Sequence, residues 1–260
     1  MASVTAETRG RTAIIRYGNP PRHYMTGEGS VQLAEAINQA AGDAPVSAIV
    51  VTGTDDVFVR HFDVSEIVQA GGAVAAGALK RENFEDGPFV QLQDACFNAP
   101  KPVIAAINGT CMGGGFEIAL ACDLRVAADA VEQLGLPETR IGIFPGGGGT
   151  QRLPRVIGEA AALDFILRGR VVGAADALAM GLVHETAPDA LVRALEIAAE
   201  FDGKGAERVA AAKRLVRGAL ARPLDEGLKA ERHTFYEVLK TDAAMDAMGE
   251  FLTTGEDITR

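Results

Sequence analysis

The stretch KPVIAAINGTCMGGGFEIALACDLRVA, residues 101–127, decides the fold class of this chain. Its apolar run at 102–107 is typical of a β-strand, and the glycines at 113–115 mark a turn. The apolar residues after that turn favour a helix, and 123–127 predicts another strand. Strand and helix alternate, which indicates an α/β fold. Because the strands are apolar without polar alternation, we expect a sheet covered on both faces.

The same pattern extends outward from this stretch. We predict strands at 12–17 and 48–52, a helix capped by Ser30, and a second helix over 89–97. The glycine- and alanine-rich segment 71–78 is low in complexity and is predicted to be a mobile loop.

The last hundred residues differ in character, because only helices are predicted from about Gly158 onward. We therefore expect a core domain at residues 1–200 and a C-terminal helical region at 201–260. The helical region is too small to hold a core of its own comfortably, so it should pack on the core domain or on another subunit.

The composition argues against several classes of partner. The chain has 260 residues, with 25 Lys and Arg against 35 Asp and Glu, and a formal net charge of −10. This acidic balance disfavours binding to nucleic acid or to an anionic membrane. No apolar stretch approaches the roughly 18 residues of a membrane helix. The three cysteines, at 96, 111 and 122, lie in apolar surroundings without paired spacing, which predicts a reducing compartment and a cytoplasmic protein.

Several common catalytic motifs are missing from the sequence. The four histidines lack metal-binding spacing, so no metal site is expected. None of the four serines lies in a G-x-S-x-G motif. The glycine run at 146–149 is not followed by Lys-Ser or Lys-Thr and does not fit G-x-G-x-x-G, so neither a nucleotide-triphosphate loop nor a dinucleotide fold is supported.

The glycine turn at 113–115 is the first candidate functional feature. Backbone N–H groups at a turn that opens a helix are suited to bind an oxyanion. Glu117 lies about one turn into this helix among apolar neighbours, so it needs either a partner or a chemical role. The structural alternative is an acid satisfied by the dipole of its own helix.

A second acid, Glu138, follows 21 residues later in LPE, residues 136–138. Pro137 disfavours helical conformation at the residue before it, which places Glu138 on a turn beside the glycine run. The structural alternative is a salt bridge to Arg140 or Arg152.

Six motifs in order resemble the enoyl-CoA hydratase/isomerase (crotonase) superfamily: KPVIAAING (101–109), GGGFE (113–117), ACDLRVA (121–127), LPE (136–138), IGIFPGGGGTQRLPR (141–155) and ALAMGLVH (177–184). The resemblance implies a spiral of repeated β-β-α units with a C-terminal helical oligomerisation region. It implies an acyl-CoA thioester as substrate and a homotrimer or dimer of trimers. No separate cofactor is implied, since coenzyme A is part of the substrate.

The resemblance also assigns roles to residues of the site. Gly114 and Phe62 would form the oxyanion hole from their backbone N–H groups. Hydratases of the family have a glutamate at each of two positions, and this chain has both, so Glu117 would deprotonate water and Glu138 would protonate C2. Two alternatives remain open, namely a Δ-isomerase that uses Glu138 alone and a non-catalytic acyl-CoA-binding member.

Coenzyme A contacts are implied for two segments, residues 22–24 and 60–64. Arg22 occupies the place of a basic residue that approaches the coenzyme, although it is equally typical of a surface arginine. The other implied contacts are His23, Tyr24, Arg60, His61, Asp63 and Val64. Asp63 is also typical of a helix cap, with Glu66 three residues on. Because His61 and Phe62 replace the family's small residues, we expect a restricted acyl pocket.

Overall fold

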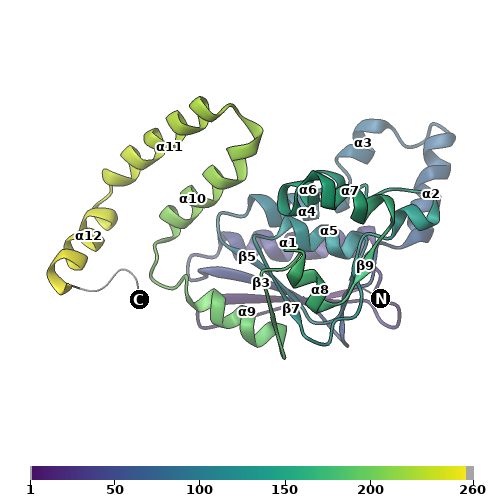
Figure 1. Ribbon diagram of the computed structural model, residues 1–260, viewed down its shortest axis with the longest axis horizontal. Coiled ribbons are helices and arrows are strands. Elements are labelled where there is room, and N and C mark those ends of the chain that lie inside the picture. Colours follow the sequence, from purple (N-terminus) through teal and green to yellow (C-terminus); the bar gives the residue numbers. More distant parts are fainter. Residues whose placement is uncertain (1, 256–260) are drawn as a thin grey trace. The chain divides into compact units, whose positions relative to one another are not determined.

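The computed structural model describes residues 2–255, and the chain divides into two compact units, residues 1–202 and 203–260 (Figure 1). The second unit is helical as far as it is described. It contains α10 (Ala206–Gly218), a 3₁₀ turn (Ala219–Ala221), α11 (Leu224–Leu239) and α12 (Asp242–Thr254). Both sheets lie in the first unit.

The larger sheet has six strands in the order β1-β2-β3-β5-β7-β10. Only β1 runs antiparallel to its neighbour, and the other pairs are parallel. The four predicted strands are confirmed as β2, β3, β5 and β7. The bounds are β1 (Ser3–Arg9), β2 (Thr12–Gly18), β3 (Ala48–Gly53), β5 (Val103–Ile107), β7 (Leu124–Ala128) and β10 (Glu185–Ala187).

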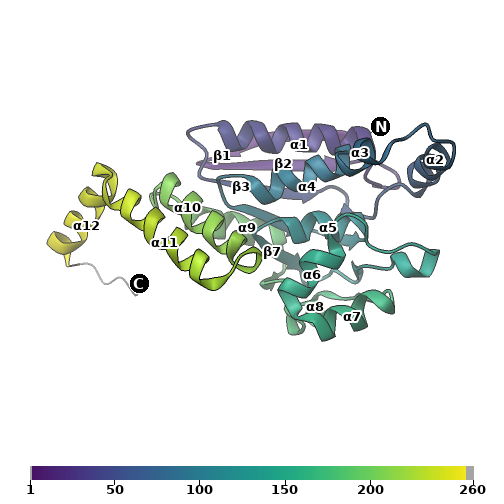
Figure 2. The ribbon, with the colours of Figure 1, turned by 90° about the horizontal axis from the view of Figure 1, so that it is seen from above.

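Helices cover both faces of this sheet, as the apolar strands predict. On one face, α1 (Gly27–Gly42) packs on β1, β2 and β3, and α4 (Pro88–Asn98) runs beside α1 (Figure 2). On the other face, α9 (Ala190–Ala199) packs on β3, β5 and β7 (Figure 1). Every residue of β3 and β5 is buried between these layers.

The smaller sheet has the order β4-β6-β8-β9, and its first three strands are parallel. Its strands are β4 (Val57–Val59), β6 (Thr110–Met112), β8 (Leu134–Gly135) and β9 (Val171–Val172). Three times the chain passes from the large sheet to the small one and then into a helix. The helices are α2 (Val64–Ala75), α5 (Gly114–Ala121) and the 3₁₀ turn η1 (Glu138–Ile141) with α6 (Gly149–Ile157). This is the expected spiral of β-β-α units.

The spiral brings distant segments of the sequence to one edge. The carboxyl ends of the parallel strands β4, β6 and β8 lie at the same edge of the small sheet. Residues 60–62 follow the first strand, Gly113 and Gly114 the second, and Glu138 the third. Each candidate site segment therefore comes from a different turn of the spiral.

Some local predictions were wrong. The predicted loop at 71–78 is largely helical, because α2 continues to Ala75 through its alanine-rich end. Ser30 does not cap a helix: α1 begins at Gly27, with Thr26 as its cap, and Ser30 Oγ donates to the Thr26 carbonyl oxygen at 2.8 Å.

The region after Gly158 is also not purely helical. Helices α7 (Glu159–Leu167) and α8 (Ala174–Ala179) follow Gly158, but strands β9 and β10 also lie in this region. Strands β9 and β10 have two and three residues, which is too short to leave an alternating pattern. A further short helix, α3 (Arg81–Glu85), lies between α2 and α4. Within residues 2–255, no helix has the length and hydropathy needed to cross a membrane.

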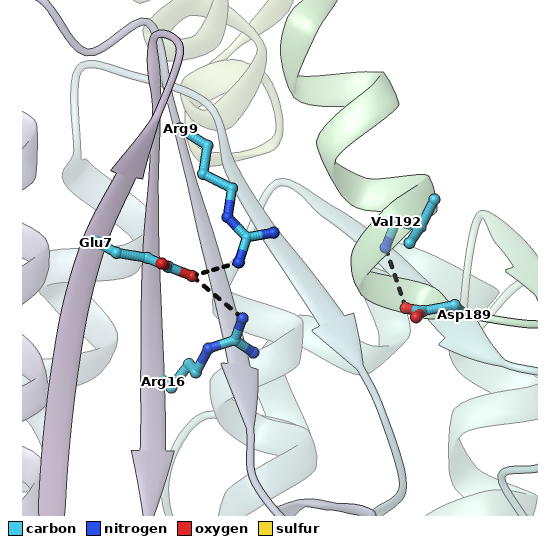
Figure 3. Close-up of polar contacts among 5 residues, drawn as sticks. All are labelled: Glu7, Arg9, Arg16, Asp189 and Val192. Carbon is cyan, nitrogen blue, oxygen red and sulfur yellow. Dashed lines mark hydrogen bonds and ion pairs between the residues drawn. The ribbon is translucent and has the colours of Figure 1, made fainter.

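Figure 3 shows polar contacts on the β1–β2 hairpin and at the start of α9. On β1, Glu7 Oε1 accepts from Arg9 Nη2 at 2.9 Å and from Arg16 Nη2, on β2, at 3.3 Å. Asp189 caps α9, because its Oδ1 accepts from the N–H groups of Leu191 and Val192 at 2.8 and 3.1 Å. The ion pairs of Glu7 are exposed and contribute little to stability, whereas Asp189 satisfies two N–H groups at the start of α9.

Helix α5 is buried along its whole length, and a buried arginine closes its carboxyl end. Arg125 of β7 donates from Nη1 to the carbonyl oxygens of Ala119 and Cys122 at 3.4 and 3.2 Å. Its Nε donates to the carbonyl oxygen of Leu182 at 2.8 Å. Arg125 thus supplies a side-chain donor to the Cys122 carbonyl and a second donor to the Ala119 carbonyl, which also accepts from Cys122 N.

We predict that Arg125→Met lowers the free energy of unfolding by about 3 kcal/mol, because buried carbonyl groups lose their donor. Denaturant unfolding of the purified variant measures this loss, and Arg9→Met, at an exposed arginine, serves as the control. Equal stability of the two variants would show that Arg125 does not support α5.

Candidate active site

Phe62 and Gly114 lie side by side at the edge of the small sheet. A methyl group added at Gly114 would lie 3.1 Å from Phe62 Cβ and 3.3 Å from Phe62 N. Gly114 is the first residue of α5, so its N–H has no acceptor within that helix. Among the described residues, no loop or cap hydrogen bond uses the N–H of Phe62 or of Gly114. Two backbone donors are therefore available at one place.

The backbone around Phe62 is fixed by pairing with the segment around Met25. Met25 N donates to the His61 carbonyl oxygen at 2.8 Å, and Asp63 N donates to the Met25 carbonyl oxygen at 2.8 Å. In extended backbone, successive N–H groups point to opposite sides. Since Asp63 N faces Met25, the N–H of Phe62 points away from that segment.

Glu117 is 3% exposed, and its carboxylate is held by the glycine run. Its Oε1 accepts from Gly147 N at 2.8 Å and from Gly149 N at 2.9 Å. Gly149 opens α6, so the positive end that stabilises this acid belongs to α6 and not to its own helix. Burial raises the pKa of Glu117, while the two N–H donors and the charge of Arg152 act to lower it.

Glu138 lies beside Gly113, where an added methyl group would be 3.2 Å from Glu138 Oε1. Its Oε2 is buried and has no hydrogen-bond partner among the described residues. Burial first, and then the negative charge of Glu117, raise the pKa of Glu138 to about 7. Burial therefore raises the pKa of both acids; three groups act against that rise at Glu117, whereas the charge of Glu117 adds to it at Glu138.

The segments expected to contact coenzyme A also come together. The rings of Tyr24 and His61 stack with centroids 4.2 Å apart, and Arg22 Cζ lies 5.9 Å from the Tyr24 ring centroid. Arg60 N donates to the His23 carbonyl oxygen at 3.1 Å, which joins the two segments through their backbones. His23 itself is buried.

Asp63 is the N-cap of α2, as predicted, and its Oδ1 accepts from Ser65 N at 2.8 Å. Glu66 does not close a capping box, because it accepts from Gly27 N at 2.8 Å and so connects α2 to the start of α1. Val64 is the first residue of α2 and is exposed.

Two residues near the acids were missed by the sequence analysis, namely Phe89 and Gln93. Arg152 was considered there only as a salt-bridge partner of Glu138, whereas its charge acts to lower the pKa of Glu117. The ring of Phe89 packs edge-on against Phe62 with centroids 5.1 Å apart. Arg152 Nη1 donates to Gln93 Oε1 at 3.1 Å and to the Gly147 carbonyl oxygen at 3.0 Å. The one available signal was Gln93, a polar residue on the buried face of a predicted helix.

Comparison with known proteins identifies the class of protein to which this fold and site belong. Residues 11–257 match the family described as enoyl-CoA hydratase/isomerase. The chain therefore belongs to the enoyl-CoA hydratase/isomerase family.

Individual relatives cover nearly the whole chain. It is 33% identical over 243 residues to a probable enoyl-CoA hydratase of Bacillus subtilis, which covers 92% of each protein. It is also 33% identical to a probable enoyl-CoA hydratase of Rhizobium meliloti, over 96% of this chain and 95% of that one. The solved structure of an enoyl-CoA hydratase from Bacillus anthracis superposes with a TM-score of 0.85 at 29% identity, covering 96% of each chain.

The contrast between the two acids is directly measurable. We predict that one glutamate carboxyl titrates with a pKa of about 7 in ¹³C NMR of glutamate-labelled protein. That resonance should be missing from Glu138→Gln and present in Glu159→Gln, a control at an exposed glutamate. A titration near pH 7 that persists in Glu138→Gln would assign it to another group.

Proposed function

We propose that the chain is an enoyl-CoA hydratase, which adds water across the C2=C3 bond of a 2-enoyl-CoA thioester to give a 3-hydroxyacyl-CoA. The observation that carries this proposal is the pair of buried carboxyl groups, Glu117 and Glu138, in contrasting environments beside the N–H groups of Phe62 and Gly114. Two carboxyls and two backbone donors are what this reaction requires.

The proposed mechanism uses each group once. The thioester oxygen accepts from the N–H groups of Phe62 and Gly114, which stabilise the enolate charge that develops on it. Glu117 takes a proton from water as the water oxygen bonds to C3. Glu138 donates its proton to C2, and transfer of a proton from Glu117 to Glu138 through solvent restores both acids.

The electrostatics support this division of roles. A base must be ionised at the start; burial raises the pKa of Glu117, and two N–H donors and the charge of Arg152 oppose that rise in favour of the ionised form. An acid must be protonated, and burial and the charge of Glu117 keep Glu138 protonated up to about pH 7. No metal or cofactor takes part in these steps, and the only coenzyme is the one carried by the substrate.

The experiment that tests the function follows the absorbance of the conjugated enoyl thioester. Loss of the band with crotonyl-CoA shows hydration, and gain of the band from a 3-enoyl-CoA shows isomerisation. An isomerase needs only one carboxylate, whereas this site holds two. Tight binding of the CoA ester without turnover would instead show a non-catalytic member.

We predict that Glu117→Gln and Glu138→Gln each reduce hydration of crotonyl-CoA at least about a hundredfold, the scale of a lost general base or acid. Circular dichroism checks that both variants fold. Full hydratase activity in Glu117→Gln would disprove the two-carboxylate mechanism. Hydration lost in that variant while isomerisation is kept would identify an isomerase activity resting on Glu138.

We propose that Phe62 and Phe89 together restrict the acyl pocket. A methyl group at Gly114 would lie 3.1 Å from both Phe62 Cβ and Phe89 Cζ, so the two rings border the proposed oxyanion hole. The Phe62 ring can narrow the path of the acyl chain while its backbone N–H remains a donor. The restricted pocket expected from the sequence thus gains a second wall in Phe89.

We predict that Phe62→Ala raises kcat/KM for longer enoyl-CoAs relative to crotonyl-CoA. The difference in transition-state free energy between the two substrates should change by about 1–3 kcal/mol, the value of a few methylenes of space. The measurement is a substrate series from four to ten carbons. Phe84→Ala, at an exposed phenylalanine, is the control. Parallel chain-length profiles for Phe62→Ala and the unmodified protein would mean that the Phe62 ring points away from the acyl chain.

We propose that coenzyme A contacts the two joined segments, residues 22–24 and 60–64. Arg22 and Arg60 would be the cations for its phosphates, with Tyr24, His61 and Val64 beside them.

We also propose that the chain forms a homotrimer or dimer of trimers through residues 203–260. Support comes from large apolar side chains exposed on α11 and α12, among them Leu224, Phe235, Tyr236 and Leu252. The buried free thiols support a reducing compartment, and we propose the cytoplasm.

A further inference from the structure

Gln93 of α4 has a fixed orientation next to the candidate base. Arg152 Nη1 donates to Gln93 Oε1 at 3.1 Å and to the Gly147 carbonyl oxygen at 3.0 Å. A guanidinium has donors only, so the amide must turn its oxygen toward Arg152 and its NH₂ group away. Arg152 therefore determines which end of the Gln93 amide faces the site.

The NH₂ group of Gln93 lies close to Glu117. A methyl group added at Gly147 would be 2.5 Å from Gln93 Nε2 and 2.6 Å from Glu117 Oε2, so both atoms lie on the same side of Gly147. The glycine N–H groups use Glu117 Oε1, which leaves Oε2 as the oxygen on the side of Gln93. The amide donor and the second carboxylate oxygen are thus neighbours.

This donor is buried without a partner. Gln93 is 3% exposed, and its Nε2 has no hydrogen-bond partner among the described residues. An unpartnered amide in the interior destabilises a fold, and an apolar side chain of similar length would avoid that cost. Among the described residues, His23 Nδ1, Arg60 Nε and Glu138 Oε2 are likewise buried without a partner, and Glu138 is the proposed acid.

We propose that Gln93 is a positioning residue of the hydration: its Nε2, which has no partner in the structure, donates to Glu117 Oε2 when that carboxyl is ionised and takes the proton of water. The inference rests on the proposed function and extends it. An ionised carboxylate oxygen has two acceptor positions, so Oε2 accepts the amide hydrogen at one and the water proton at the other. The contacts from Arg152 to Gln93 and from Gln93 to Glu117 then fix the orientation of the Glu117 carboxylate plane.

The charges around Glu117 explain why a neutral donor suits this position. Arg152 from α6 favours the ionised base, and Glu138 from η1 is the acid that faces it. A cation in place of Gln93 would also favour ionisation of Glu138, which must stay protonated. An amide favours the ionised form of Glu117 through a hydrogen bond and adds no net charge.

The test compares Gln93→Met, which has the same length without a donor, with Gln91→Met on the exposed side of α4. We expect Gln93→Met to lower kcat about tenfold or more. The acid limb of its kcat/KM profile should move to higher pH, because the ionised form of Glu117 loses a donor. Gln91→Met should leave kcat and the pH profile unchanged. Gln93→Glu should move the acid limb further, since a second carboxylate would face Glu117.

A second readout separates this inference from the proposed function. The ¹³C resonance of the Glu117 carboxyl, assigned with Glu117→Gln, should titrate at higher pH in Gln93→Met than in Gln91→Met, whatever substrate is turned over. No hydration by the unmodified protein would refute the proposed function while the NMR shift still tests the contact. The inference would be overturned if the acid limb and the Glu117 titration were unchanged in both Gln93→Met and Gln93→Glu. A lowered melting temperature as the only change would assign Gln93 a purely structural role.

Discussion

The contact between Gly115 and the backbone of β4 sets the geometry on which the rest of the site depends. A methyl group at Gly115 would lie 2.1 Å from the carbonyl oxygen of Val59, so only a glycine allows α5 to approach the strand this closely. The approach brings the first N–H of α5 next to the loop that follows β4. Without it, Phe62 and Gly114 would not lie side by side.

Repetition of the β-β-α unit explains how the remaining groups arrive. Parallel strands end at a common edge, and each turn of the spiral adds one segment there: the Phe62 loop, then the α5 N-terminus with Glu117, then Glu138. The run after the third turn, Gly147 to Gly149, closes over Glu117 and supplies its donors. Burial raises the pKa of both acids, and only Glu117 has N–H donors and a nearby arginine that oppose this rise.

The sequence predicts those parts of the fold and site that local pattern encodes. Strands β2, β3, β5 and β7 are apolar runs bounded by turns, and Glu117 and Glu138 stand out as acids in apolar or glycine-rich surroundings. Strands β4, β6 and β8 are too short to leave a pattern. Phe89 and Gln93 were missed because their role depends on α4 lying beside α5, a contact between segments about twenty residues apart that no local rule encodes.

The complete burial of α5 has a consequence for how such an enzyme can diverge. The proposed base, Glu117, lies on a helix whose eight residues are all buried, so a new residue at this position must also fit the packing of that helix. By contrast, Val64, Ile143 and Phe144 are exposed. Substitutions at such exposed positions cost little stability, whereas a change of residue at position 117 must also be accommodated by the core.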